Sequence, residues 1–211
     1  MRDTSPGTAR VIEWGVAMRT LPGEAQCGDV HLVKPIASGV LLAFADGLGH
    51  GEEAAAAARA AVTALERHAG ESPLALVERS HRALHGTRGA VLSLALVNRH
   101  ERSLTWLGVG NVEGTLLYGT DGARRRRATL ITRGGIVGSE LPRLQPETLR
   151  VAPGDTLIFA TDGIREGFAE GLPPEATPQQ VADHILAQHG KGTDDALALV
   201  ARFVSGAGPG G

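Results

Sequence analysis

Short apolar runs, separated by glycine, proline and polar residues, follow one another along most of the chain. Such runs, bounded by turn-forming residues, are typical of β-strands. They predict strands at residues 11–20, 29–36, 39–45, 90–99, 103–110, 148–152, 155–161 and 196–204. The segment GTLLYGTDGARRRRATLI predicts a further hairpin that turns at Asp121 and Gly122.

Three other segments carry helical signals. Residues 52–67 begin with two glutamates, which suit the positive end of a helix, and continue with an alanine-rich run. Residues 72–85 and 177–189 each open with Ser or Thr followed by proline, a favourable pair for the first helical positions. We therefore expect three helices, two of them consecutive.

The order of these elements predicts the fold class. Strands precede two helices, many strands follow, and one helix and one strand end the chain, so the pattern indicates α+β with mostly antiparallel sheet. Several strands are apolar on both faces and need cover on both sides, which a sandwich of two sheets with helices outside would provide. We expect a flexible N-terminus at 1–9, one domain at 10–204 and a disordered tail at 205–211.

Composition narrows the class of protein without identifying a function. The formal net charge of −2 gives no electrostatic reason to expect nucleic acid or an anionic membrane as partner. No segment has the roughly 20 apolar residues that a membrane-spanning helix needs, and the N-terminus lacks the apolar region of a signal peptide. The single cysteine excludes an internal disulfide. These features predict a cytoplasmic protein.

Aspartates gather at the ends of the predicted strands. Two apolar strands end in Asp-Gly, at Asp46 and Asp162, and two others begin with aspartate, at Asp29 and at Asp194 with Asp195. An isolated Asp-Gly pair is most simply a turn. However, a carboxylate next to a buried strand is strongly disfavoured without a partner.

Strand pairing favours a cation as that partner. If 29–36 and 39–46 form a hairpin, Asp29 and Asp46 lie directly opposite each other, and their charges repel. The candidate ligands are carboxylates, with no Cys or His at zinc spacing, so a hard ion such as Mg²⁺ or Mn²⁺ is favoured over Zn²⁺. Two such ions could bind a phosphoryl oxygen and activate water for attack, without a protein nucleophile.

An ordered set of short motifs resembles a known family. The set consists of GD at 28–29, ADGLGHG at 45–51, TRGA at 87–90, GVGNVEG at 108–114, GGIVG at 134–138, GD at 154–155, ATDGI at 160–164 and DDALALV at 194–200. In this order they resemble the SpoIIE-like branch of the metal-dependent protein phosphatases, within the protein phosphatase 2C superfamily. The resemblance covers residues 10–204 and is greatest to the small serine phosphatases of this branch that act on stressosome proteins.

The resemblance implies a four-layer αββα sandwich with two Mn²⁺ or Mg²⁺ ions between the sheets. Asp46 would bridge the ions, and Gly47 would offer its carbonyl oxygen. Asp162 and Asp194 would complete one metal site, and Asp29 would serve the other. Catalysis would depend on Asp46 and Asp162 through metal-activated water, and the substrates would be phosphorylated STAS-domain or stressosome proteins that regulate sigma factors.

Two other classes of function stay open at this stage. One is a catalytically weak module that binds phosphorylated proteins, and the other is a hydrolase of small phosphate esters. Several individual residues are also ambiguous. His50 could contact phosphate or shape the turn before the helix, and Arg19 is a guess for a residue that binds phosphate. Asn111 suits a turn, and Cys27 is expected not to be a nucleophile. Gly28 stands at a position where some family members have an acidic residue.

Overall fold

The computed structural model describes residues 11–119, 126–173 and 175–204. The predicted flexible N-terminus at 1–9, the predicted tail at 205–211 and the predicted hairpin turn at Asp121 and Gly122 lie outside these ranges.

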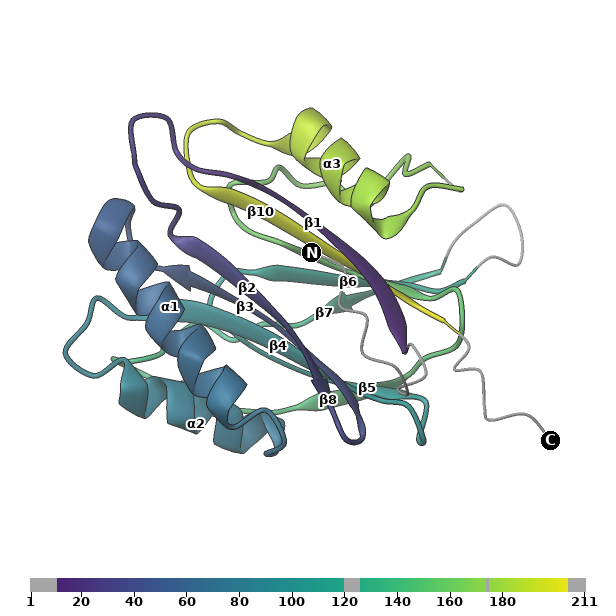
Figure 1. The fold of residues 1–211 in the computed structure, drawn as a ribbon, viewed down its shortest axis with the longest axis horizontal. Helices are drawn as coiled ribbons and strands as arrows, with labels where there is room; N and C mark the ends of the chain where they lie inside the picture. Colours follow the sequence, from purple (N-terminus) through teal and green to yellow (C-terminus); the bar gives the residue numbers. More distant parts are fainter. Residues whose placement is uncertain (1–10, 120–125, 174, 205–211) are drawn as a thin grey trace.

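Two antiparallel sheets of five strands each face one another (Figure 1). The first contains, in spatial order, β1 (Ile12–Arg19), β10 (Ala196–Phe203), β9 (Thr156–Ala160), β6 (Glu113–Leu117) and β7 (Arg127–Leu130). The second contains β2 (Asp29–Ile36), β3 (Gly39–Gly47), β4 (Ala90–Asn98), β5 (Ser103–Val109) and β8 (Glu147–Arg150). The predicted mostly antiparallel architecture is confirmed.

Helices cover the outer face of each sheet. α1 (Gly51–Arg67) and α2 (Pro73–Ala83) pack on the second sheet, and α3 (Pro178–His189) packs on the first (Figure 1). The result is the predicted four-layer αββα sandwich. Within the described ranges, no helix combines the length and the apolarity that crossing a membrane requires.

The proline-led helices start where the sequence predicts. The Ser72 side chain accepts the N–H of Ala75 at the start of α2, and Thr177 forms a capping box with Gln180 at the start of α3. α2 ends at Ala83, two residues before the predicted end at position 85, and a turn follows.

The strand β3 shows why several strands are apolar on both faces. Leu42 and Phe44 point into the layer between the sheets, whereas Leu41 and Ala43 pack under α1 and α2. All four side chains are fully buried. Because successive side chains of a strand point to opposite faces, a strand covered by a sheet on one side and helices on the other must be apolar at every position.

The layer between the sheets is centred on aromatic packing. Trp106 of β5 stacks on Phe159 of β9, with ring centroids 5.0 Å apart. A Cβ on Gly114 would lie only 2.5 Å from an indole carbon of Trp106, so this glycine of β6 makes room for the ring. Few aromatics are therefore enough to join the two sheets.

Helix α1 approaches the end of β3 very closely. A Cβ on Gly47 would lie 1.9 Å from the backbone oxygen of Ala54, so only glycine fits at this contact. The buried face of the helix consists mainly of alanines, which allows the close approach. β3 includes Asp46 and Gly47, so these residues end the strand itself and are not in a turn after it.

Residues 131–146 connect β7 to β8 without a helix or strand of their own. Isolated bridges join Ala90 to Val137 and Val109 to Arg133, which holds this segment against the ends of β4 and β5. The segment therefore lies at the same end of the sandwich as the end of β3.

Candidate metal centre

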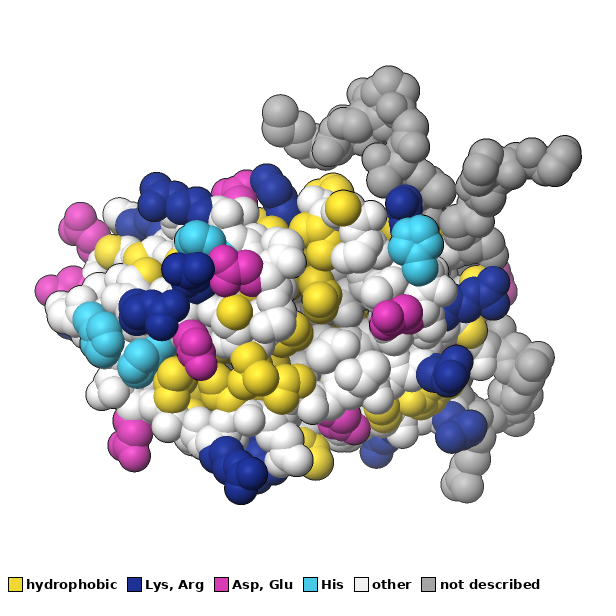
Figure 2. Space-filling view, turned by 90° about the horizontal axis from the view of Figure 1, so that it is seen from below, with side chains coloured by type: hydrophobic (Ala, Val, Ile, Leu, Met, Phe, Trp, Pro, Cys, Tyr) yellow, Lys and Arg dark blue, Asp and Glu magenta, His cyan; other side chains and the backbone are white. Residues whose placement is uncertain are grey.

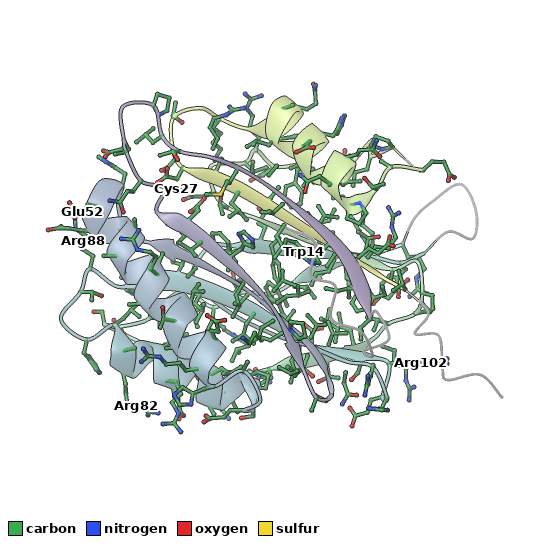
Figure 3. The ribbon with its side chains drawn as sticks, in the orientation of Figure 1. Trp14, Cys27, Glu52, Arg82, Arg88 and Arg102 are labelled. Carbon is green, nitrogen blue, oxygen red and sulfur yellow. The ribbon has the colours of Figure 1, made fainter. Side chains whose placement is uncertain are left out.

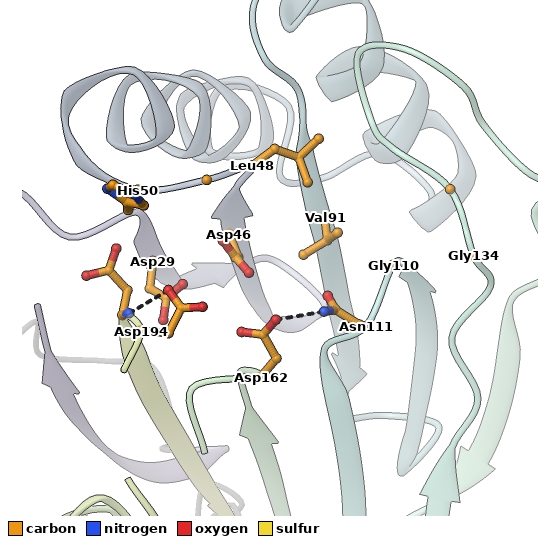
Figure 4. A pocket seen from close by; sticks show the side chains of 13 residues that line it. Asp29, Asp46, Leu48, His50, Val91, Gly110, Asn111, Gly134, Asp162 and Asp194 are labelled. Carbon is orange, nitrogen blue, oxygen red and sulfur yellow. Dashed lines mark hydrogen bonds between the residues drawn. The ribbon is translucent and has the colours of Figure 1, made fainter. Parts of the chain in front are cut away.

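A pocket of about 430 Å³ opens at one end of the sandwich (Figure 4). Five aspartates line it: Asp29, Asp46, Asp162, Asp194 and Asp195. Asp29 begins β2 and Asp46 lies near the end of β3, whereas the other three follow β9 or precede β10. Antiparallel pairing places the end of β3 beside the start of β2, and the end of β9 beside the start of β10. Because the two sheets face each other, these strand ends meet at the same end of the sandwich.

Asp29 and Asp46 are direct cross-strand partners. The β2–β3 register runs from Ile36 opposite Gly39 to Asp29 opposite Asp46, which confirms the predicted pair. The Asp29 side chain is buried, with a relative exposure of 2%, and its Oδ2 has no hydrogen-bond partner among the described residues. Such a buried, unpaired carboxylate oxygen is costly unless a cation or a proton reaches it.

The pKa values of both carboxyl groups reflect this crowding. Burial, followed by the charge of Asp46, raises the pKa of Asp29 to about 9. Burial, followed by the charges of Asp162, Asp194 and Asp195, raises the pKa of Asp46 to about 7. The pocket therefore concentrates negative charge that protons or a cation must balance.

Asp162 receives a hydrogen bond that the sequence did not reveal. The Asn111 Nδ2 donates to Asp162 Oδ2 at 2.9 Å, and Asn111 also lines the pocket (Figure 4). The Lys191 ammonium group donates to the backbone oxygen of Asp162. The predicted turn role of Asn111 does not account for its side-chain contact with a predicted ligand.

Asp194 and Asp195 differ in what their oxygens already bind. Asp194 Oδ1 accepts the N–H of Asp195 at 2.9 Å. Both oxygens of Asp195 are engaged, because they accept the N–H groups of Leu21 and Gly28, each at 2.8 Å. Asp195 thus anchors the connection between β1 and β2, which ends at Asp29, and this agrees with the preference for Asp194 as the ligand.

The same anchor explains the glycine before Asp29. A Cβ on Gly28 would lie 3.1 Å from Asp195 Oδ2 and 3.4 Å from the Ala54 Cβ. An acidic side chain at position 28 would meet a carboxylate already committed to the backbone. The acid found there in some family members therefore does not fit this chain.

Two other predicted site residues lie at the edge of the pocket or outside it. The Gly47 N–H donates to the Gly28 oxygen at 3.1 Å, and Gly47 is not among the residues that line the pocket. Arg19 is exposed at the end of β1 and does not line the pocket either.

His50 occupies the N-cap position of α1, but its side chain makes no capping hydrogen bond. The ring lines the pocket, and its Nδ1 lies 2.6 Å from Glu24 Oε1. The turn therefore explains the backbone of His50 and not the placement of its side chain.

Cys27 lies in the connection between β1 and β2 (Figure 3) and is half-buried. Burial, as the largest cause, raises the pKa of its thiol to about 12. The thiolate is the reactive form of cysteine. Cys27 is therefore unsuited to act as a nucleophile, as predicted.

The donor set fits a hard divalent cation. Among the described residues, no three His, Cys, Asp or Glu side chains already form a closed metal-binding group. The pocket nevertheless offers carboxylates from both sheets, one with an unpaired buried oxygen. Mg²⁺ prefers oxygen ligands and keeps several waters, so it needs few protein ligands.

Comparison with known proteins finds a matching family and a similar curated protein. Residues 37–204 match the model of the family described as Stage II sporulation protein E (SpoIIE). The curated "Phosphoserine phosphatase RsbX" of Bacillus subtilis (strain 168) is 28% identical over 142 residues, which cover 67% of this chain and 69% of that protein.

Solved structures also resemble this chain in fold. One, described as "The bacterial stressosome: a modular system that has been adapted to control secondary messenger signaling", is 32% identical with a TM-score of 0.82 and covers 90% of this chain and 99% of its own. A crystal structure of RsbX in complex with magnesium has a TM-score of 0.81 at 23% identity, covering 92% of this chain and 96% of its own. The chain belongs to the SpoIIE family.

Proposed function

We propose that this protein is a metal-dependent phosphatase that hydrolyses phosphoserine or phosphothreonine in bacterial stressosome or STAS-domain proteins. The observation that carries the proposal is the Asp29–Asp46 pair, in which a buried carboxylate oxygen without a partner faces a second carboxylate. Membership of the family supports phosphatase activity, and the carboxylates that line the pocket support metal binding there.

Four carboxylates would hold the divalent ions: Asp29 and Asp46 from the second sheet, and Asp162 and Asp194 from the first. The carbonyl oxygen of Gly47 is a further predicted ligand. Bound Mg²⁺ or Mn²⁺, two ions by resemblance, would polarise the phosphoryl oxygens and increase the acidity of water. These four carboxylates lie at one end of the sandwich, and Asn111 donates a hydrogen bond to Asp162.

Relatives support the choice of substrate. RsbX is named a phosphoserine phosphatase, and another similar structure comes from work on the bacterial stressosome. On the face seen in Figure 2, acidic and basic side chains are interspersed, so this face does not favour a strongly charged partner. A phosphorylated regulatory protein of the stress response, acting in the cytoplasm, is the substrate we propose.

Phosphate release from a phosphorylated STAS-domain protein, measured against Mn²⁺ concentration, tests the proposal. We expect activity that rises with Mn²⁺, stops with EDTA and is lost in Asp46→Asn. The matched control is Asp183→Asn, which makes the same change on the exposed face of α3, outside the pocket. Activity that survives EDTA, or survives Asp46→Asn, would contradict the mechanism.

The same measurements separate the alternative functions. Stoichiometric binding of the phosphoprotein without phosphate release at saturating Mn²⁺ would indicate a binding module. Much more efficient cleavage of small phosphate esters than of any phosphoprotein would indicate a small-ester hydrolase.

A further inference from the structure

The Asp162 carboxylate has one oxygen already engaged by a neutral donor. Asn111 Nδ2 donates to Oδ2 at 2.9 Å across a sequence separation of 51 residues. An ionised carboxylate only accepts hydrogen bonds, so the amide nitrogen of Asn111 must face it. The other oxygen, Oδ1, has no such bond from Asn111.

The backbone on the Asn111 side of this contact is held firmly. Gly110 has a φ of +105°, and a Cβ there would lie 2.2 Å from a side-chain carbon of Val91. Its N–H donates to the Arg133 oxygen at 2.8 Å. The turn therefore presents Asn111 in one direction.

The backbone on the Asp162 side is equally constrained. A Cβ on Gly163 would lie 1.9 Å from the backbone oxygen of Asp195, so the chain after Asp162 packs directly on the start of β10. Lys191 binds the Asp162 carbonyl oxygen. The hydrogen bond thus joins two fixed points, one on the β5–β6 turn and one at the end of β9.

This arrangement sets the direction in which the Asp162 oxygens can face an ion. A carboxylate oxygen has two lone pairs, so the hydrogen bond from Asn111 leaves Oδ2 able to bind an ion and fixes the orientation of the carboxylate group. Mg²⁺ demands near-ideal octahedral geometry, so its binding depends on how each ligand is oriented.

We propose that Asn111 is a positioning residue that holds the Asp162 carboxylate in the orientation in which it binds Mg²⁺ or Mn²⁺. This inference rests on the proposed function only in taking Asp162 as a metal ligand. It does not depend on which phosphoprotein is the substrate, or on turnover.

Calorimetric titration of the metal-free protein with MnCl₂, without substrate, tests the inference. The measured quantity is the Mn²⁺ affinity. Loss of a hydrogen bond to a metal ligand typically costs 10–100-fold in metal affinity, so we expect Asn111→Ala to lower the Mn²⁺ affinity about tenfold. Asn111→Gln keeps an amide donor, and it should lose less affinity than Asn111→Ala.

Asn98→Ala is the matched control. Asn98 ends β4 at the opposite end of that strand from the pocket, and its side chain accepts backbone N–H groups of the following turn. The Mn²⁺ affinity should not change in this variant, and thermal melts of the metal-free variants report whether each is folded.

Each outcome has a distinct meaning. An unchanged Mn²⁺ affinity in folded Asn111→Ala would overturn the positioning role and leave the proposed phosphatase intact. No binding of Mn²⁺ by the unaltered protein would overturn both proposals. Mn²⁺ binding that weakens in Asn111→Ala, with no phosphatase activity in the unaltered protein, would support the inference and contradict the proposed function.

Discussion

The stability of the metal-free protein should fall as pH rises, because Asp29 resists ionisation in the folded state. Burial and the charge of Asp46 raise the pKa of Asp29 from 3.8 to about 9. Well below pH 3.8 the carboxyl group is protonated in both the folded and the unfolded chain, so it adds no pH dependence to the free energy of unfolding. Between the two values the unfolded chain loses the proton and the folded chain keeps it, so stability decreases with pH.

The magnitude follows from this difference in proton binding. One proton per molecule corresponds to about 1.4 kcal/mol per pH unit. From pH 5 to pH 7 the free energy of unfolding should therefore decrease by up to about 3 kcal/mol through Asp29 alone. Asp29→Asn has no group to ionise, so its stability relative to the unaltered protein should increase by about that amount over the same range.

Urea unfolding in the presence of a chelator, at pH 5, 6 and 7, measures this effect. Asp183→Asn provides the control, since it makes the same change at an exposed carboxylate on α3, outside the pocket. Saturating Mn²⁺ should make the unaltered protein more stable than Asp29→Asn, because an ion at 100 times its Kd stabilises the folded state by about 2.7 kcal/mol. A constant difference between Asp29→Asn and the unaltered protein from pH 5 to pH 7 would refute the reasoning.

Three further predictions concern the residues around the pocket. Asp195→Asn replaces an acceptor of two backbone N–H groups with one amide oxygen and one NH₂ group, and urea unfolding should show a loss of about 1–3 kcal/mol. Gly163→Ala places a Cβ 1.9 Å from a backbone oxygen and should cost at least about 1–3 kcal/mol, whereas Gly70→Ala, with open space around it, should change stability by less than about 1 kcal/mol. Because burial raises the pKa of the Cys27 thiol to about 12, iodoacetamide should label it at pH 8 much faster in urea than in the folded protein; equal rates would contradict this assignment.

The sequence was sufficient to predict those parts of the site that depend on the alternation of side chains along strands. A two-residue connection between Ile36 and Gly39 sets the register of the β2–β3 hairpin, and the period of two carries that register to Asp29 and Asp46. The apolar runs likewise predicted two covered sheets, because a strand buried on both faces needs two covering layers. These features are local or repeat regularly along the chain.

Contacts between distant turns could not be predicted in this way. Asn111 and Asp162 lie on different connections, and no periodicity relates their side chains. The role of Asp195 depends on the path of the chain from β1 to β2, which crosses from one sheet to the other. Its neighbour Asp194 has the same chemistry, so only the three-dimensional path distinguishes an anchor from a candidate ligand.

The division of the aspartates between two sheets would make metal binding stabilise the whole sandwich. Asp29 and Asp46 belong to the second sheet, whereas Asp162 and Asp194 flank strands of the first. Without a cation, like charges face each other across the layer that Trp106 and Phe159 hold together. An ion bound by both pairs would replace this repulsion with attraction and join the sheets at their open end. Mn²⁺ should therefore slow hydrogen exchange in β3 and β9 together, and protection confined to one sheet would indicate that only one pair binds the ion.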